Sequence, residues 1–163
     1  MNDNIIAFPN AQDFDEDEDF DEEMFATSEM AKKYLDIFEK EMRAQKLSEK
    51  TIEKHLSNVS FYIDAYLNRD EECGSIREGC YRIDGYLGFF YIEKCMWATP
   101  TGMKDSAAGI KKFYKCLRDL DIVEDEDYEH LCDEIKTNMS TWQNTLKRYD
   151  EMDEDDDDFW DVF

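Results

Sequence analysis

Two histidines and five cysteines are the side chains in this sequence best suited to nucleophilic catalysis. A nucleophilic thiol needs a neighbouring base to take its proton, and the pair nearest in sequence is His130 and Cys132. Side chains two residues apart on a helix point away from each other. Core packing is the better explanation of the cysteines, including Cys95 and Cys116, because free cysteine is among the most buried residue types. His55 and His130 lie beside apolar positions and are expected at the boundary of the core, so no catalytic residue is predicted.

The acidic run DFDEDEDFDEE, residues 13–23, has the composition of a calcium-binding loop but not its spacing. An EF-hand loop that began at Asp13 would need glycine at its sixth position and glutamate at its twelfth. The sequence has Glu18 and Met24 there. The glycines are scattered singly, so they form no phosphate-binding loop. We therefore predict no metal site and no cofactor.

The net charge of -23 on this chain of 163 residues is carried by its two ends. Residues 13–23 hold nine acids and no base, and residues 150–161 hold another nine acids and no base. All 19 lysines and arginines lie between these runs, among 23 acids, which leaves that part at -4. Runs of like charge bury little surface and are typical of disorder. We predict a disordered acidic arm over residues 1–26, a folded domain over 27–149 and an acidic aromatic tail over 150–163.

The cysteines also indicate a compartment, because they are odd in number and include no closely spaced pair. The sequence shows no apolar segment long enough for a signal peptide. It also has no apolar run near the roughly 20 residues that a membrane-spanning helix needs. We predict a cytoplasmic protein with reduced thiols and no membrane partner.

Helical periodicity repeats through the middle of the chain without an alternating strand pattern, which predicts an all-α fold. About five helices built from helical hairpins are expected to form a small bundle. The first helix is predicted over about residues 28–46, and the second begins after Ser48, which offers a hydroxyl cap. The connection at Leu47 is so short that the two helices must pack as an antiparallel hairpin.

The second half of the domain is predicted from two further apolar stripes and the breaks between them. NRDEECGSIREGCYR is expected to be a loop, and the aromatic stretch IDGYLGFFYIEKCMW a buried helix or, alternatively, a strand. A fourth helix is predicted on the stripe Ala107, Ile110, Phe113 or Tyr114, Leu117 and Leu120. A fifth is predicted on a stripe from Tyr128 to Tyr149.

Two segments resemble the core-binding, or SAM-like N-terminal, domain of tyrosine recombinases and phage integrases. KLSEKTIEKHLSNVSFYIDAYL is similar to its first helical hairpin, and TPTGMKDSAAGIKKFYKCLRDLDIV to a later helix. Together they cover roughly residues 28–123. That domain clamps duplex DNA. The resemblance implies contacts at the start of the second helix, namely Lys50, Thr51 and Lys54, and on the fourth helix, namely Lys104, Lys111, Lys112 and Lys115.

The residues support a DNA-binding face only in part. Lys104, Lys111 and Lys115 are seven and four residues apart, so they share one helix face that can neutralise phosphates. The alternative is that they solvate the outer face of an amphipathic helix. The sequence does not predict the family's catalytic domain: neither histidine has arginine three residues on, so DNA cleavage and enzyme activity are not expected.

The C-terminal tail sets Phe159, Trp160 and Phe163 among aspartates. We expect either a linear motif that docks its aromatic rings into a partner pocket rimmed by basic residues, or a tail that only keeps the protein soluble. The tail is similar in composition to the acidic C-terminal tips of single-stranded-DNA-binding proteins, which recruit partners and occupy their own protein's DNA site.

The sequence therefore predicts a non-catalytic binding protein that binds duplex DNA, with acidic tails that modulate the binding. The alternative is an acidic protein–protein regulator or DNA mimic that binds a basic DNA-binding protein such as a recombinase. Six acids around the turn into the fifth helix oppose DNA on that side: Asp119, Asp121, Glu124, Asp125, Glu126 and Asp127.

Overall fold

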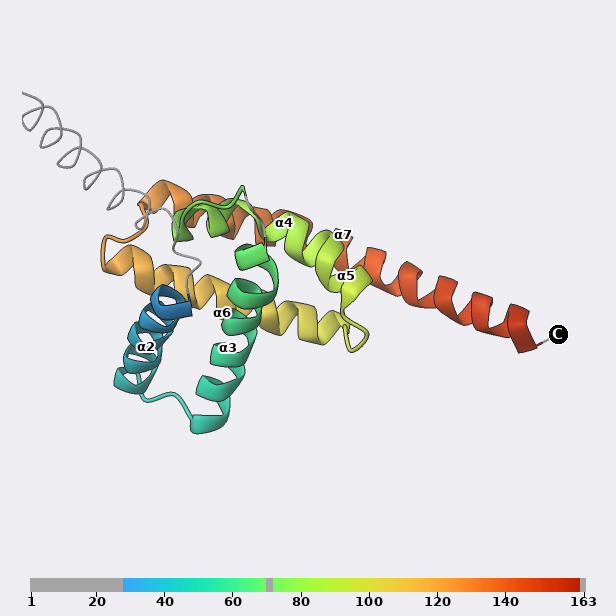
Figure 1. Ribbon diagram of the computed structural model, residues 1–163, viewed down its shortest axis with the longest axis horizontal. Helices are drawn as coiled ribbons and strands as arrows, with labels where there is room; N and C mark the ends of the chain where they lie inside the picture. Colours follow the sequence, from blue (N-terminus) through green and yellow to red (C-terminus); the bar gives the residue numbers. More distant parts are fainter. Residues whose placement is uncertain (1–27, 70–71, 162–163) are drawn as a thin grey trace, which may run out of the picture.

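A computed structural model of the protein describes residues 28–69 and 72–161, and these are helical almost throughout (Figure 1). The α-helices are α2 (Ser28–Ala44), α3 (Glu49–Phe61), α4 (Ile83–Gly85), α5 (Tyr91–Lys94), α6 (Pro100–Asp119) and α7 (Asp125–Asp161). Short π and 3₁₀ segments adjoin them, namely η1 (Tyr62–Tyr66), η2 (Leu67–Arg69), η3 (Ile76–Tyr81) and η4 (Tyr86–Phe90). The described ranges contain no strand, so the predicted all-α bundle is confirmed. The predicted N-terminal arm lies outside the described residues.

The predicted first hairpin is confirmed: α2 and α3 run antiparallel and pack together (Figure 1). The Ser48 hydroxyl caps α3 by accepting a hydrogen bond from the Thr51 amide at 3.2 Å. Arg43, in the last turn of α2, binds Glu49 in the first turn of α3. The second predicted helix continues from α3 through the π turn η1, whose Tyr62 and Ile63 are buried.

The end of α2 places a residue other than glycine in the left-handed conformation. Lys46 has φ 60°, and its amide donates to the Arg43 carbonyl at 3.0 Å while the Leu47 amide donates to Met42 at 3.2 Å. This helix cap favours glycine, because a Cβ crowds the backbone in that conformation. We predict that Lys46→Gly raises the free energy of unfolding by up to about 1 kcal/mol, measured by urea denaturation. Lys46→Ala keeps the Cβ, and a gain as large in that variant would contradict the explanation.

The core forms where α6 packs against α3 on one side and α7 on another, with α2 at its edge. In Figure 1 the segment α4–η4–α5 lies along α7, above α6. Aromatic side chains make up much of this core, and the largest fully buried ones are Tyr62, Tyr86, Tyr114, Phe38 and Phe113. None of the described helices combines the length and the apolar character needed to cross a bilayer.

The aromatic stretch after residue 82 is helical, so the helix prediction is confirmed and the strand alternative is wrong. Its two glycines admit neighbouring rings: a Cβ on Gly85 would lie 2.2 Å from the Tyr66 hydroxyl, and one on Gly88 would lie 3.0 Å from the Trp142 ring. Trp142 donates a 2.8 Å hydrogen bond from Nε1 to Asp84. Phe89, in the stretch expected to form a buried helix, is 62% exposed.

The predicted loop between η2 and α4 contains the 3₁₀ helix η3, whose inner side is buried. Two buried tyrosines hold it by their hydroxyls. Tyr62 donates to the Gly79 carbonyl at 2.6 Å, and Tyr114 donates to the Ile76 carbonyl at 2.8 Å. Hydropathy periodicity does not report such long-range bonds, so the sequence predicted only a break here.

Two helix boundaries differ from those predicted. α6 begins at Pro100, where Thr99 caps it by accepting from the Gly102 amide at 2.9 Å, and Leu120, expected on its apolar face, follows the helix and is 52% exposed. α7 continues to Asp161, although its apolar stripe ends at Tyr149. No glycine or proline follows Gly109 to stop the helix. In Figure 1 the last turns of α7 project beyond the other helices.

Candidate functional site

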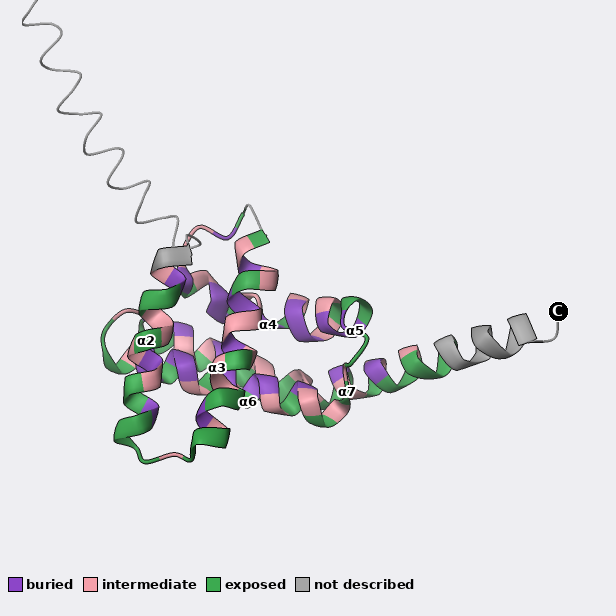
Figure 2. Cartoon of the chain, turned by 60° about the horizontal axis from the view of Figure 1, so that its bottom comes forward, coloured by how far each residue is buried: buried purple, intermediate pink, exposed green. Residues whose placement is uncertain are grey.

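The predicted lysine face on α6 is present as a surface. Buried residues occupy the inner side of this helix, among them Met103, Ile110 and Leu117, as expected of an amphipathic helix (Figure 2). Lys104, Lys111 and Lys115 are exposed on the other side. α6 holds five basic and two acidic residues, whereas α7 holds fifteen acidic and three basic ones. The positive charge of the second half of the domain is therefore concentrated on α6.

Both acids of α6 have basic partners. Asp105 pairs with Lys54 of α3, with 3.0 Å between the carboxylate oxygen and the lysine Nζ. Asp119 pairs with Arg118, whose guanidinium also lies 4.5 Å from the centre of the Tyr128 ring. Asp105 is turned toward α3. Asp119 follows Lys115 by four residues, so it lies on the same side of the helix, at the end of the row of lysines. The face formed by Lys104, Lys111 and Lys115 is called the lysine face below.

Lys112 does not belong to that face. It is half-buried and lines a cavity of about 240 Å³ between α2 and α6, together with Glu41, Lys115 and Asp119. Its position is rotated toward α2, and Glu41 supplies a carboxylate to the same cavity. The resemblance implied a DNA contact at Lys112, which is less exposed than the lysine face and adjoins it at Lys115.

The three implied contacts on α3 lie in its first turns. Lys50 and Lys54 are exposed, and Lys54 is the partner of Asp105. Thr51 is half-buried, and its hydroxyl lies 2.9 Å from the Ser48 hydroxyl within the helix cap. Thr51 therefore takes part in capping the N-terminus of α3. α3 packs against α6, and the pair of Lys54 with Asp105 joins the two helices at this point.

His55 lies at the boundary of the core, as predicted, and faces α6 at Gly109. A Cβ on Gly109 would lie 3.1 Å from His55 Nδ1, so glycine lets the two helices approach closely here. Burial lowers the pKa of His55, and the positive charges of Lys112 and Lys54 lower it further. The imidazole is therefore neutral near pH 7. Its Nδ1 has no hydrogen-bond partner among the described residues.

The turn from α5 into α6 exposes a tryptophan that the sequence analysis did not single out. Trp97 is 63% exposed, and its ring meets Phe61 of α3 edge-on with 5.6 Å between ring centres. Its neighbour Met96 is fully exposed. The signal was present in the sequence: Met96 and Trp97 stand outside any apolar stripe, directly before the Thr99 and Pro100 cap.

A groove of about 430 Å³ lies beside Trp97, between α3 and the start of α6. Phe61, Tyr91 and Trp97 form its aromatic wall. The remaining lining residues are small, polar or charged, namely Lys54, Ser57, Asn58, Gly102, Asp105 and Ser106. We call this the aromatic groove. It adjoins the positive surface at Lys54.

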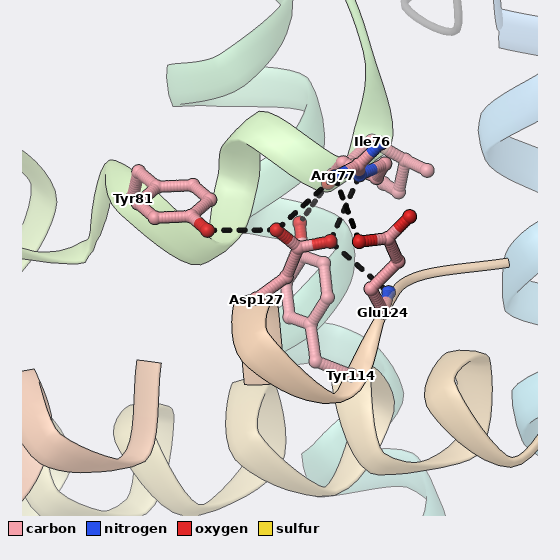
Figure 3. A network of polar contacts seen from close by, with 6 residues as sticks. All are labelled: Ile76, Arg77, Tyr81, Tyr114, Glu124 and Asp127. Atoms are coloured by element: carbon pink, nitrogen blue, oxygen red, sulfur yellow. Dashed lines mark hydrogen bonds and ion pairs between the residues drawn. The ribbon is translucent and has the colours of Figure 1, made fainter. Parts of the chain in front are cut away.

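One of the six acids expected to oppose DNA is not a surface charge. Asp127 is 2% exposed and accepts hydrogen bonds from Arg77 Nε at 2.8 Å and from the Tyr81 hydroxyl at 2.7 Å (Figure 3). It also accepts from the Glu124 amide at 3.0 Å, which begins α7. This network fastens η3 to the start of α7. The acids Asp119, Asp121, Glu124, Asp125 and Glu126 remain exposed.

The cysteines pack in the core, and four of the five are buried. Burial raises the pKa of Cys116 to about 11 and that of Cys95 in the same direction. These thiols are therefore protonated near neutral pH. Cys132, expected in the core, is only half-buried. His130 stacks on the Tyr81 ring with 4.5 Å between ring centres.

The acidic run of residues 13–23, tested above as a calcium loop, lies outside the described residues. Within residues 28–69 and 72–161 no group of three or more histidine, cysteine, aspartate or glutamate side chains is arranged to hold a metal ion. Phe159 and Trp160 fall within the span of α7, but their side chains lie outside the described part of the structure, as does Phe163 entirely.

No protein-family model matches this chain, and no curated protein or solved structure is significantly similar to it. The functional argument therefore depends on the surfaces described above.

Proposed function

We propose that this chain is a non-catalytic cytoplasmic protein that binds duplex DNA through the lysine face of α6 and the start of α3. The observation that carries the proposal is the exposed row of Lys104, Lys111 and Lys115 on one side of α6, which Asp119 adjoins only at its end. The row rises about 16 Å along the helix at 1.5 Å per residue. Duplex DNA carries one charge per about 1.7 Å of its axis, so the row can meet several phosphates. The core-binding-like resemblance supports the same surface.

The acidic arms are proposed to modulate this binding by competing with DNA for the same positive surface. They are covalently joined to it, so their effective concentration is high whatever the protein concentration. Salt weakens both interactions, because both are between charges. DNA binding by the natural chain is then weaker than the lysine face alone would give.

The test is fluorescence anisotropy with a labelled duplex, using the full chain and a variant in which the nine acids of residues 13–23 are changed to asparagine or glutamine. The variant is expected to bind at least tenfold more tightly at low salt. If three phosphates are neutralised, the affinity should fall about 40-fold between 50 and 200 mM salt. Absence of binding by both proteins at low salt would refute the DNA-binding proposal.

The lysine face is tested in the same assay with the triple variant Lys104→Gln, Lys111→Gln and Lys115→Gln. Each lysine that contacts a phosphate contributes about 0.9 to the slope of log affinity against log salt, so the slope should decrease by nearly three. The matched control is Lys136→Gln with Lys147→Gln, two exposed lysines on α7. An equal loss in the control would mean that the binding is not specific to α6.

A second candidate function is an acidic regulator or DNA mimic that binds a basic DNA-binding protein such as a recombinase. The observation that favours it is α7, with its fifteen acids and its exposed residues Glu126, Glu129 and Asp133. Such a surface attracts basic proteins and repels nucleic acid. Under this function, neutralising residues 13–23 gives no DNA binding, and the tail with Phe159, Trp160 and Phe163 is the segment to use in capturing a basic partner.

A further inference from the structure

The aromatic groove is built like a site for a ring-bearing peptide rather than for a phosphate backbone. Trp97 and Met96 are the kinds of side chain enriched at protein interfaces. The Phe61 and Tyr91 rings stand behind Trp97, so an inserted ring would meet apolar surface on more than one side. The opposite lining is polar, which suits a peptide backbone.

The charges around the groove favour an acidic peptide. Lys54 and Asp105 lie in its lining and pair with each other at 3.0 Å, so the positive charge near the groove comes from Lys104, which is exposed next to Asp105 in the sequence. The groove also reaches the start of α6, whose first turn contains no acid. A helix of this length carries a partial positive charge at its N-terminus. The groove therefore combines an aromatic wall with a positive end.

We propose that the aromatic groove binds the chain's own N-terminal acidic arm, with Phe20 inserted beside Trp97. Phe20 lies between Asp19 and Asp21 in the run of residues 13–23, so the arm has the chemistry that the groove requires. This site adjoins the lysine face at Lys104, but its occupation does not depend on DNA binding. It explains why the acidic arm carries aromatic residues.

The length of the arm makes Phe20 the nearest phenylalanine of the acidic run that can reach the groove, because Phe14 lies six residues farther from the body. α2 begins at Ser28, and its residues Ala31 and Lys32 line a cavity with Asp64. Asp64 is less than one turn from Phe61 along the same helical run, so the arm leaves the body near the groove but on another side of that helix. An extended chain spans about 3.3 Å per residue. Phe20, eight residues before Ser28, reaches about 26 Å, which is enough to pass around a helix about 10–12 Å wide.

Phe25 provides a matched control for that argument. It is only three residues before Ser28 and reaches about 10 Å, less than the path around the helix requires. It is the same residue type in the same arm. Phe25→Ala should therefore leave the groove unchanged, whereas Phe20→Ala should empty it.

The test uses the ¹⁵N-labelled full chain and the NMR signal of the Trp97 indole N–H, assigned with Trp97→Phe. Phe20→Ala is expected to shift this signal and to increase its broadening by a soluble paramagnetic agent. High salt should shift the Trp97 signal of the natural protein in the same direction. Phe25→Ala should do neither. An unchanged Trp97 signal in Phe20→Ala, or an equal change in Phe25→Ala, would overturn the proposal.

Two further outcomes separate this proposal from related ones. If tenfold dilution of the natural protein gives the same change as Phe20→Ala, the occupant is the arm of a second copy, and the intramolecular form is overturned. A Trp97 signal that responds to Phe20→Ala while the anisotropy assay shows no DNA binding would support the groove and refute only the DNA-binding function. The two proposals therefore fail separately.

Discussion

Gly79→Ala is expected to lower the free energy of unfolding by about 3 kcal/mol or more. A Cβ at this position would lie 1.7 Å from the Tyr114 hydroxyl oxygen and 2.8 Å from its Cζ. Tyr114 has no room to move, because it is fully buried and its hydroxyl is bonded to the Ile76 carbonyl at 2.8 Å. The carbonyl of Gly79 itself accepts from Tyr62, so a shift of η3 also breaks that bond.

The measurement is urea denaturation followed by far-ultraviolet circular dichroism, with Gly74→Ala as the matched control. A Cβ on Gly74 comes no closer than 3.7 Å to its nearest neighbour, an ordinary contact, so this variant should change stability little. Tyr114→Phe removes the hydroxyl that the new methyl group meets. The double variant with Gly79→Ala should therefore be more stable than the sum of the two single losses predicts. Simple additivity would show that Tyr114 is not the cause.

Gly79 also shows what the sequence could and could not predict about the fold. The helices with long apolar stripes, α2, α3, α6 and α7, were predicted because each can bury one face whatever its neighbours are. The segment η3 has no such stripe. Its conformation depends on hydroxyls from Tyr62 and Tyr114, which are distant in sequence, and a glycine there looked only like a break in the pattern.

The candidate sites also differ in whether local spacing or the packing of distant segments determines them. Spacing alone predicted the shared face of Lys104, Lys111 and Lys115, since seven and four residues return to one side of a helix. It could not place Lys112 in the cavity against α2, because that depends on how two helices pack. The aromatic groove likewise exists only where the α5–α6 turn brings Trp97 onto Phe61 of α3.

Asp127→Asn is expected to lower the free energy of unfolding at pH 7 by about 2 kcal/mol. The carboxylate accepts bonds from Arg77, Tyr81 and the Glu124 amide, and the amide of asparagine cannot serve all three donors. Arg77 lies fifty residues away, so the loss also loosens η3 from α7. The control is Asp125→Asn, whose side chain is 85% exposed and 3.9 Å from Arg118, and which should change stability by less than about 0.5 kcal/mol.

The pH dependence distinguishes loss of this charge from a general packing defect. Burial alone would raise the pKa of Asp127, but the hydrogen bonds from Arg77, Tyr81 and the Glu124 amide outweigh it and lower the pKa below its ordinary value of 3.8. A lowered pKa in the folded state contributes stability at any pH above the unfolded value, and that stability is lost as the pH falls through the folded one. The difference between the natural chain and Asp127→Asn should therefore be constant from about pH 8 to pH 5 and shrink below about pH 4. A difference that persists unchanged in acid would mean that shape, not charge, is what Asp127 supplies.

The titration of Tyr81 tests the same network at alkaline pH. Its hydrogen bond to the Asp127 carboxylate, with a smaller contribution from burial, raises the pKa of Tyr81 to about 12. Because asparagine carries no negative charge, the tyrosinate absorbance of Tyr81 in Asp127→Asn should appear at lower pH, nearer the ordinary value of 10. The folded pKa is raised, so this contribution to stability is present below about pH 10 and is lost as the pH rises through about 12. The network that joins η3 to α7 is therefore intact at every pH at which Asp127 is ionised and Tyr81 is protonated. Changing either residue should shift one limit of this pH range.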